Sequence, residues 1–234
     1  MPEPQDELAA LAPKVGTRPA ETGNAAGSPR PSATAAEPAF LDPAGAGAFA
    51  YAAGNYEGAL AQYQTAIERN PDDAESYSNM GQMLVRLKRV EEAIPHFDRA
   101  ITILPQRWAY HFNRARALAL LERWDEAIAG YQQAQRLFPG DYATAFNLAQ
   151  TFHRKGDETA AVEQYLRAIE LDPSDPTFRL ALGISYERLE RRADAAAAYA
   201  EYLRLAPNAP DAEKVRARIA LLAGAAEETR AEDR

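Results

Sequence analysis

Three asparagines recur at intervals of 34 residues, at Asn79, Asn113 and Asn147. An amide side chain carries a hydrogen-bond donor and an acceptor together. It can therefore bond to both the N–H and the C=O of one peptide group. A regular row of such amides would hold an extended polypeptide backbone whatever its side chains, so this spacing favours backbone recognition over bond-making chemistry.

Catalytic chemistry has little support in the sequence. The histidines, His96, His111 and His153, lie far apart and show neither metal-ligand nor catalytic-triad spacing. No glycine-rich phosphate loop, nucleophile elbow or zincin motif occurs. The chain has no cysteine, which excludes a disulfide framework and a thiolate metal site. We therefore expect no enzyme activity, no catalytic residue, no metal site and no cofactor.

The asparagines belong to a repeat that runs through most of the chain. Prolines recur every 34 residues, at Pro71, Pro105, Pro139, Pro173 and Pro207. The same period governs alanines (Ala59, Ala93, Ala127, Ala161, Ala195), aromatic residues (Tyr63, Phe97, Tyr131, Tyr165, Tyr199) and small residues (Gly47, Gly81, Ala115, Ala149, Gly183). Each unit contains two stretches with apolar residues at helical spacing, separated by a short break such as Gly54-Asn55.

Each unit is therefore predicted to be a pair of antiparallel helices. Small residues such as Gly81 and Ala93 would let the two backbones approach closely, and Phe97 would fill the space left between them and the next pair. The recurrent proline ends the second helix because it lacks the N–H donor and clashes with the preceding turn. Pro95 is expected in the first turn of its helix, where a missing N–H is harmless.

This pattern resembles the tetratricopeptide repeat, whose 34-residue period and whose small, aromatic and proline positions match those above. The resemblance covers residues 40–209 as five units, 40–73, 74–107, 108–141, 142–175 and 176–209. It implies an all-α fold, a right-handed α-solenoid of five helix pairs. Unit five departs from the pattern at Tyr202, where a small residue is expected.

The segments outside the repeats have different compositions. Residues 1–39 form an Ala/Pro-rich tail with too few large apolar residues to offset the entropy of ordering, so we expect disorder there. A helix at 210–223, with Val215, Ile219 and Leu222 on one side, is expected to cap the last repeat. Residues 224–234 then form a charged tail.

Charge and composition restrict the partners. The formal net charge is −8, so nucleic acid is not an expected ligand. No run of eighteen apolar residues and no signal-like segment occurs, which predicts no membrane insertion and a cytoplasmic location. Abundant alanine and scarce lysine indicate a bacterial gene of high G+C content.

The resemblance also implies a binding surface. In this family the first helix of each unit lines a concave groove, which places the three asparagines there. The same correspondence adds two apolar residues, Phe112 and Phe146, and four arginines, Arg86, Arg116, Arg154 and Arg188. Arginines in the groove of an acidic protein favour a ligand with carboxylates. The predicted function is a non-catalytic protein–protein interaction scaffold or adaptor that binds an extended peptide or protein segment in the groove.

These assignments have structural alternatives. Asparagine is common at its place throughout the family, the phenylalanines belong in part to the core, and the arginines could pair with neighbours such as Glu187.

The clamp by which chaperone adaptors of this fold bind a C-terminal carboxylate is missing, since its places hold residues such as Glu75 and Ser78. Two other roles remain open: a structural subunit that docks through its ends or convex face, and a substrate-presenting partner of a separate enzyme.

Overall fold

The computed structural model describes residues 42–232, with side chains described for 42–224, so the expected disorder of residues 1–39 lies outside them. Within this part of the chain there are eleven helices and no strand, which confirms the all-α prediction. The described residues form two compact units, one ending at Pro139 and the other beginning at Gly140.

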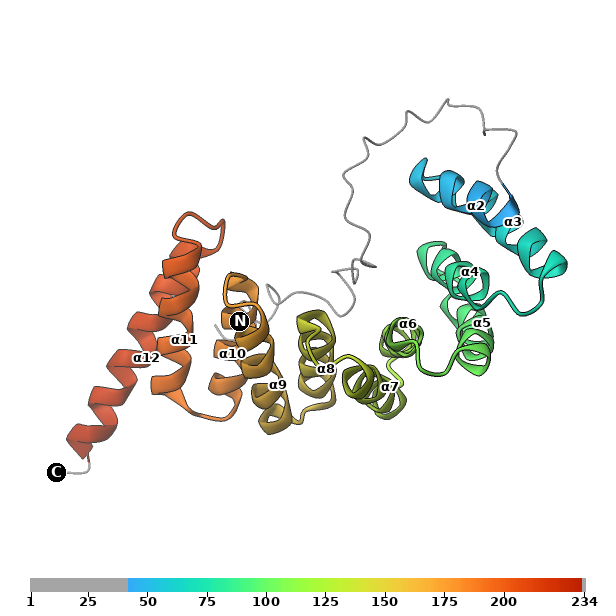
Figure 1. The fold of residues 1–234 in the computed structure, drawn as a ribbon. Helices are drawn as coiled ribbons and strands as arrows, with labels where there is room; N and C mark the ends of the chain where they lie inside the picture. Colours follow the sequence, from blue (N-terminus) through green and yellow to red (C-terminus); the bar gives the residue numbers. More distant parts are fainter. Residues whose placement is uncertain (1–41, 233–234) are drawn as a thin grey trace. The chain divides into compact units, whose positions relative to one another are not determined.

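The first unit consists of three successive helix pairs (Figure 1). They are α2 (Pro43–Ala52) with α3 (Tyr56–Arg69), α4 (Ala74–Arg86) with α5 (Val90–Ile103), and α6 (Trp108–Leu120) with α7 (Trp124–Leu137). The helices of each pair pack against each other, and the second helix of one pair packs on the first helix of the next. Because α4 also contacts α6, the first helices of the second and third pairs are neighbours.

The second unit has two pairs and a further helix. They are α8 (Tyr142–Lys155) with α9 (Glu158–Leu171), α10 (Pro176–Arg188) with α11 (Arg192–Leu205), and α12 (Ala212–Glu232). Helix α12 packs against α11 and buries Val215 and Leu222. It continues past the expected end of the capping helix to Glu232.

The close approach of paired helices depends on the small residues. A Cβ atom added to Gly81 would lie 2.7 Å from Cε1 of Phe97, and one added to Gly183 would lie 2.4 Å from Cε1 of Tyr199. Both rings are completely buried. At these positions the small residue therefore gives room to a ring on the second helix of the same pair, whereas the sequence pattern predicts Phe97 between one pair and the next.

The turn inside each pair places one residue in the left-handed backbone region. Its φ is positive at Gly54, Lys88, Glu122, Gly156 and Glu190, which are spaced by 34 residues. Only two of the five are glycine, the residue that adopts this conformation without steric cost. The helices that follow Gly54 and Gly156 begin with side-chain caps, since Asn55 and Asp157 accept hydrogen bonds from backbone N–H groups of the first turn.

Two expectations are modified by the structure. Helix α5 begins at Val90, so Pro95 lies in its second turn and not in the first. Its missing N–H leaves the carbonyl of Glu91 without its usual helical donor, and both residues are exposed to water, which can replace that donor.

Tyr202, the departure from the repeat pattern, is buried and donates its hydroxyl hydrogen to Asp211, just before α12. The larger residue thus anchors the start of the last helix.

Candidate functional site

Asn79 keeps part of its amide available. It lies half-buried on α4, and its Oδ1 accepts a hydrogen bond from Nε2 of Gln82 at 3.2 Å. Its side chain also hydrogen-bonds to Tyr63. Burial, with the nearby Glu75 and Tyr51, raises the pKa of Tyr63 to about 12, and the bond from Asn79 opposes this. Asn79 therefore joins two helix pairs and still contacts solvent.

The other two asparagines are more deeply placed. Asn113 on α6 is buried, and its Nδ2 is 3.5 Å from Oγ of Ser78 on α4. Asn147 on α8 is 1% exposed and donates from Nδ2 to the carbonyl of Ala143 at 2.8 Å. In this structure both amides make bonds within the protein. Backbone binding by the three asparagines stays a prediction, with Asn79 the most accessible of them.

Phe112 and Phe146 lie in the cores of their helix pairs. Phe112 is 0% exposed, and its ring centroid is 5.4 Å from that of Tyr131 on α7. Phe146 is 4% exposed and packs on Phe178 at 4.7 Å between centroids. Their burial agrees with the alternative that these phenylalanines belong to the core. Contact with a ligand would require movement of the surrounding rings.

The four predicted arginines have different environments. Arg86 and Arg154 are exposed in the last turns of α4 and α8. Arg188 is half-exposed and pairs with Glu158 at 3.0 Å, not with Glu187. Arg116 is 7% exposed, and burial lowers the pKa of its guanidinium, with Arg86 adding to the effect. The arginines thus comprise two free surface charges, one ion pair and one buried charge.

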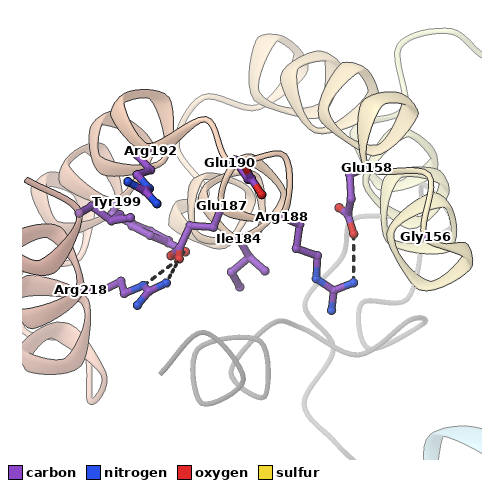
Figure 2. A pocket seen from close by; sticks show the side chains of 10 residues that line it. Gly156, Glu158, Ile184, Glu187, Arg188, Glu190, Arg192, Tyr199 and Arg218 are labelled. Carbon is purple, nitrogen blue, oxygen red and sulfur yellow. Dashed lines mark hydrogen bonds and ion pairs between the residues drawn. The ribbon is translucent and has the colours of Figure 1, made fainter. Parts of the chain in front are cut away.

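The second unit contains a pocket of about 740 Å³ (Figure 2). Three of its lining residues lie on α10, two on α11, two on α12 and one on α9, and the other two lie in the turns beside these helices. Its lining residues are Gly156, Glu158, Ile184, Glu187, Arg188, Glu190, Arg192, Tyr199, Arg218 and Leu222. Six of these are charged and only two are aliphatic. Typical small-molecule sites have mostly apolar walls, so the lining suits a polar ligand.

One wall of the pocket is an ionic cluster around Glu158 at the start of α9. Its carboxylate binds Nδ1 of His153 at 2.9 Å and Nη1 of Arg188 at 3.0 Å. Oγ of Ser185 lies 3.4 Å from the same histidine nitrogen. Burial opposes ionisation of Glu158, but the hydrogen bond and charge of His153 outweigh it and hold the pKa of Glu158 below its usual value.

The opposite wall joins the last helix to the last pair. Glu187 on α10 accepts a hydrogen bond from the hydroxyl of Tyr199 at 2.6 Å, and Nε of Arg218 on α12 donates to it at 2.7 Å. Figure 2 shows Tyr199 and Arg218 meeting at the Glu187 carboxylate. Burial and the Glu187 carboxylate raise the pKa of Tyr199, so its phenol stays protonated.

Sequence reasoning identified Arg188 as a groove residue and Glu187 as a possible partner of an arginine, and it missed the rest of this cluster. The repeat pattern marks Tyr199 only as a core aromatic, and it gives Glu158 and Arg218 no special place. Arg218 lies outside the repeats, so no comparison between units could relate it to Glu187. Arg188 and Glu158 are 30 residues apart, and Arg218 and Glu187 are 31 apart. A search for residues that recur every 34 positions therefore does not pair them.

Two negative findings apply to the described residues. Among the side chains of residues 42–224, no group of three or more His, Asp or Glu is arranged to hold a metal ion. No helix of that part of the chain is long and apolar enough to cross a bilayer.

Comparisons with known proteins match the observed helix pairs. Models described as "Tetratricopeptide repeat" match residues 50–107, 180–232 and 108–141, and a "TPR repeat" model matches 149–190. The chain belongs to the tetratricopeptide repeat family, as its residue pattern predicted. Among curated proteins, the comparison finds no match.

Solved structures with the same fold include several repeat proteins. MamA 41-end from Desulfovibrio magneticus RS-1 is 18% identical with a TM-score of 0.66, over 70% of this chain and 93% of that one. YrrB, described as "a TPR protein with an unusual peptide-binding site", is 22% identical with a TM-score of 0.64, over 73% and 88%. TTC0263, a TPR protein from Thermus thermophilus, is 24% identical with a TM-score of 0.56, over 77% and 96%. These similarities concern the fold.

Proposed function

We propose that this protein is a non-catalytic interaction scaffold that binds extended segments of a partner protein along the first helices of its pairs, in each of the two units by itself. The observation that carries the proposal is the pocket on α10. Its volume of about 740 Å³ can hold several side chains, and its walls carry both signs of charge. Such walls recognise polar side chains of a polypeptide better than an apolar small molecule.

Accessible side chains on the other first helices support the same function. Asn79 and Arg86 on α4, and Arg154 on α8, reach solvent. Asn113, Asn147, Phe112 and Phe146 support these helices from the inside and are not assigned direct contacts. The proposed contact set therefore comprises Asn79, Arg86 and Arg154, with Arg188 and Arg192 at the pocket.

A matched pair of arginines tests the proposal in the first unit. Peptides are first selected on the full chain from a displayed library of unstructured sequences, and their affinities are measured by fluorescence anisotropy. Arg86→Glu changes an exposed arginine in the last turn of a first helix. Arg69→Glu makes the same change in the last turn of a second helix, α3. We expect the first to weaken binding at least tenfold and the second to change it little.

Arg192 and Arg204 provide the corresponding pair in the second unit. Arg192 lines the pocket, whereas Arg204 lies at the other end of α11 beside Glu201. We expect Arg192→Ala to weaken peptides that occupy the pocket, and Arg204→Ala to leave them bound. If the variants of Arg69 and Arg204 lose affinity while those of Arg86 and Arg192 keep it, the proposal is wrong and docking through the outer face takes its place.

A further inference from the structure

Arg116 on α6 is a buried cation without a counter-ion. It is 7% exposed. Among residues 42–224, whose side chains are described, no carboxylate pairs with it and no acceptor takes a hydrogen bond from it. The chain carries 34 acidic residues against 26 basic ones, so the absence does not reflect a shortage of acids. Buried charges are normally paired, because an unpaired one loses its hydration without compensation.

The groups near Arg116 do not supply a negative charge. Those in electrostatic range are Tyr131 on α7, Arg86 on α4 and Tyr51 on α2. The hydroxyl of Tyr131 is itself buried without a hydrogen-bond partner, and burial raises its pKa, so it is neutral. Arg86 adds a second positive charge on the adjacent first helix. The surroundings therefore increase the need for an anion.

Another buried arginine of the same protein shows the usual arrangement. Arg218 on α12 is 15% exposed and is held by Glu187, which also receives the hydroxyl of Tyr199. Arg116 has a comparable burial and an unpartnered tyrosine hydroxyl nearby, but lacks the carboxylate. At the same place in the neighbouring repeats the chain has neutral amides, Gln82 and Gln150. The charge at Arg116 is therefore not required by the repeat itself.

We propose that Arg116, assisted by Arg86, binds the carboxylate of an acidic side chain on the partner segment. This inference rests on the proposed function and adds the ligand chemistry of the first unit. The planar guanidinium can donate two parallel hydrogen bonds to a carboxylate, and the low exposure of the site strengthens them. A side-chain carboxylate fits better than a terminal one, because the ligand backbone then continues past Arg116 to the accessible amide of Asn79.

The proposal predicts opposite effects on stability and binding. Arg116→Gln introduces the residue found at the same place in adjacent repeats and removes an uncompensated buried charge. We expect its melting temperature to equal or exceed that of the wild type, while recognition of an acid is lost. A fall of many degrees in both Arg116→Gln and Arg116→Met would show that the guanidinium supports the fold, and would contradict the proposal.

NMR titration with defined peptides gives the direct test. The probes are acetyl-Ser-Gly-Glu-Gly-Ser-amide, its Gln counterpart, and the Gln peptide with a free C-terminal carboxylate, all at constant ionic strength. The reporter is the Nε–Hε signal of Arg116, assigned by its absence from Arg116→Gln. We expect the Glu peptide to bind in the millimolar range and at least about tenfold more tightly than the Gln peptide, which corresponds to about 1.4 kcal/mol.

Two protein variants and the three peptides show whether Arg116 binds a side-chain carboxylate. Arg116→Gln should abolish the preference for Glu, while Arg107→Gln, which removes an exposed charge just before the same helix, should retain it. Equal binding of the Glu and Gln peptides to the wild type would overturn the carboxylate site. So would a preference for the free C-terminus, which would identify the other source of carboxylate. In either case the library-selected peptides still decide the proposed function separately.

Discussion

At the scale of single residues, the position beside the recurrent aromatic ring is glycine in three units and alanine in two. Gly47, Gly81 and Gly183 leave no room for a Cβ, whereas Ala115 and Ala149, at the same place in their repeats, carry one and are buried. The cost of adding a Cβ at one of the glycines depends on how freely the facing ring can move. Phe97 has no polar anchor, but the hydroxyl of Tyr199 is fixed by Glu187 at 2.6 Å.

We therefore expect unequal effects from the same substitution at Gly81 and Gly183. Alanine gains about 1 kcal/mol of helix propensity over glycine at either position. Overpacking of the fixed Tyr199 ring costs about 1–3 kcal/mol, so Gly183→Ala should lower the free energy of unfolding. At Gly81 the Phe97 ring can shift and the two effects should nearly cancel. Urea unfolding followed by circular dichroism measures both, with Gly140→Ala, which has open space around it, as the control.

The left-handed turn residues provide a second test. Glu122 adopts a φ of 58°, a conformation that costs a residue with a Cβ about 1–2 kcal/mol. Glu122→Gly should relieve this and raise the free energy of unfolding by up to about 1 kcal/mol after the greater freedom of glycine in the unfolded chain is included. Gly156→Ala, at the same place in the next repeat, should lower it by a similar amount. A stabilising Gly156→Ala would contradict the explanation.

Glu158 predicts a pH dependence. Its pKa is lowered in the folded protein, so it contributes stability above its unfolded pKa of about 4.3, and that contribution is lost as the pH falls through the folded value. Glu158→Gln should lower the free energy of unfolding by about 1–3 kcal/mol at pH 7, and the difference from wild type should shrink below about pH 4. Glu163→Gln, an exposed change on the same helix, should show little difference at any pH.

At the scale of helices, α12 is attached by both apolar and ionic contacts. Val215 and Leu222 are buried against the last pair, Tyr202 binds Asp211, and Arg218 binds Glu187. The ionic contact has the larger consequence if it is broken, because Glu187 is only 4% exposed and cannot regain its hydration without movement of the helix. The last helix thus holds a buried charge as well as covering an apolar face.

Replacing one partner of this pair should be more harmful than replacing both. Arg218→Met leaves Glu187 with only the Tyr199 hydroxyl and should cost about 3–5 kcal/mol. The double variant Glu187→Gln/Arg218→Met should recover much of that loss. Arg216→Met breaks an exposed pair with Glu213 on the same helix and should cost less than about 1 kcal/mol. Urea unfolding of these variants and of Glu187→Gln alone measures the coupling energy between Glu187 and Arg218. If the double variant loses the sum of the two single losses, the two residues are not coupled and the prediction is wrong.

At the scale of the whole molecule, the 34-residue period accounts for most of the fold. The prolines, small residues and aromatic residues predicted the helix pairs because each acts on its own helix or its immediate neighbour. The ionic clusters could not be predicted in this way. Glu187 and Arg218 belong to a repeat and to a helix outside the repeats, and the burial of Arg116 depends on other helices around it. Periodicity identifies what the units share, whereas the candidate sites depend on where the units differ.

The central claim is that, in each unit taken by itself, a partner segment lies along the first helices of the pairs. Hydrogen–deuterium exchange of the full chain, with and without a library-selected peptide at saturation, tests it most directly. We expect slower exchange in α4, α6, α8 and α10, and little change in α3, α5 and α7. Protection confined to those second helices, with α4, α6, α8 and α10 unchanged, would contradict the account and show that the protein binds through its outer face.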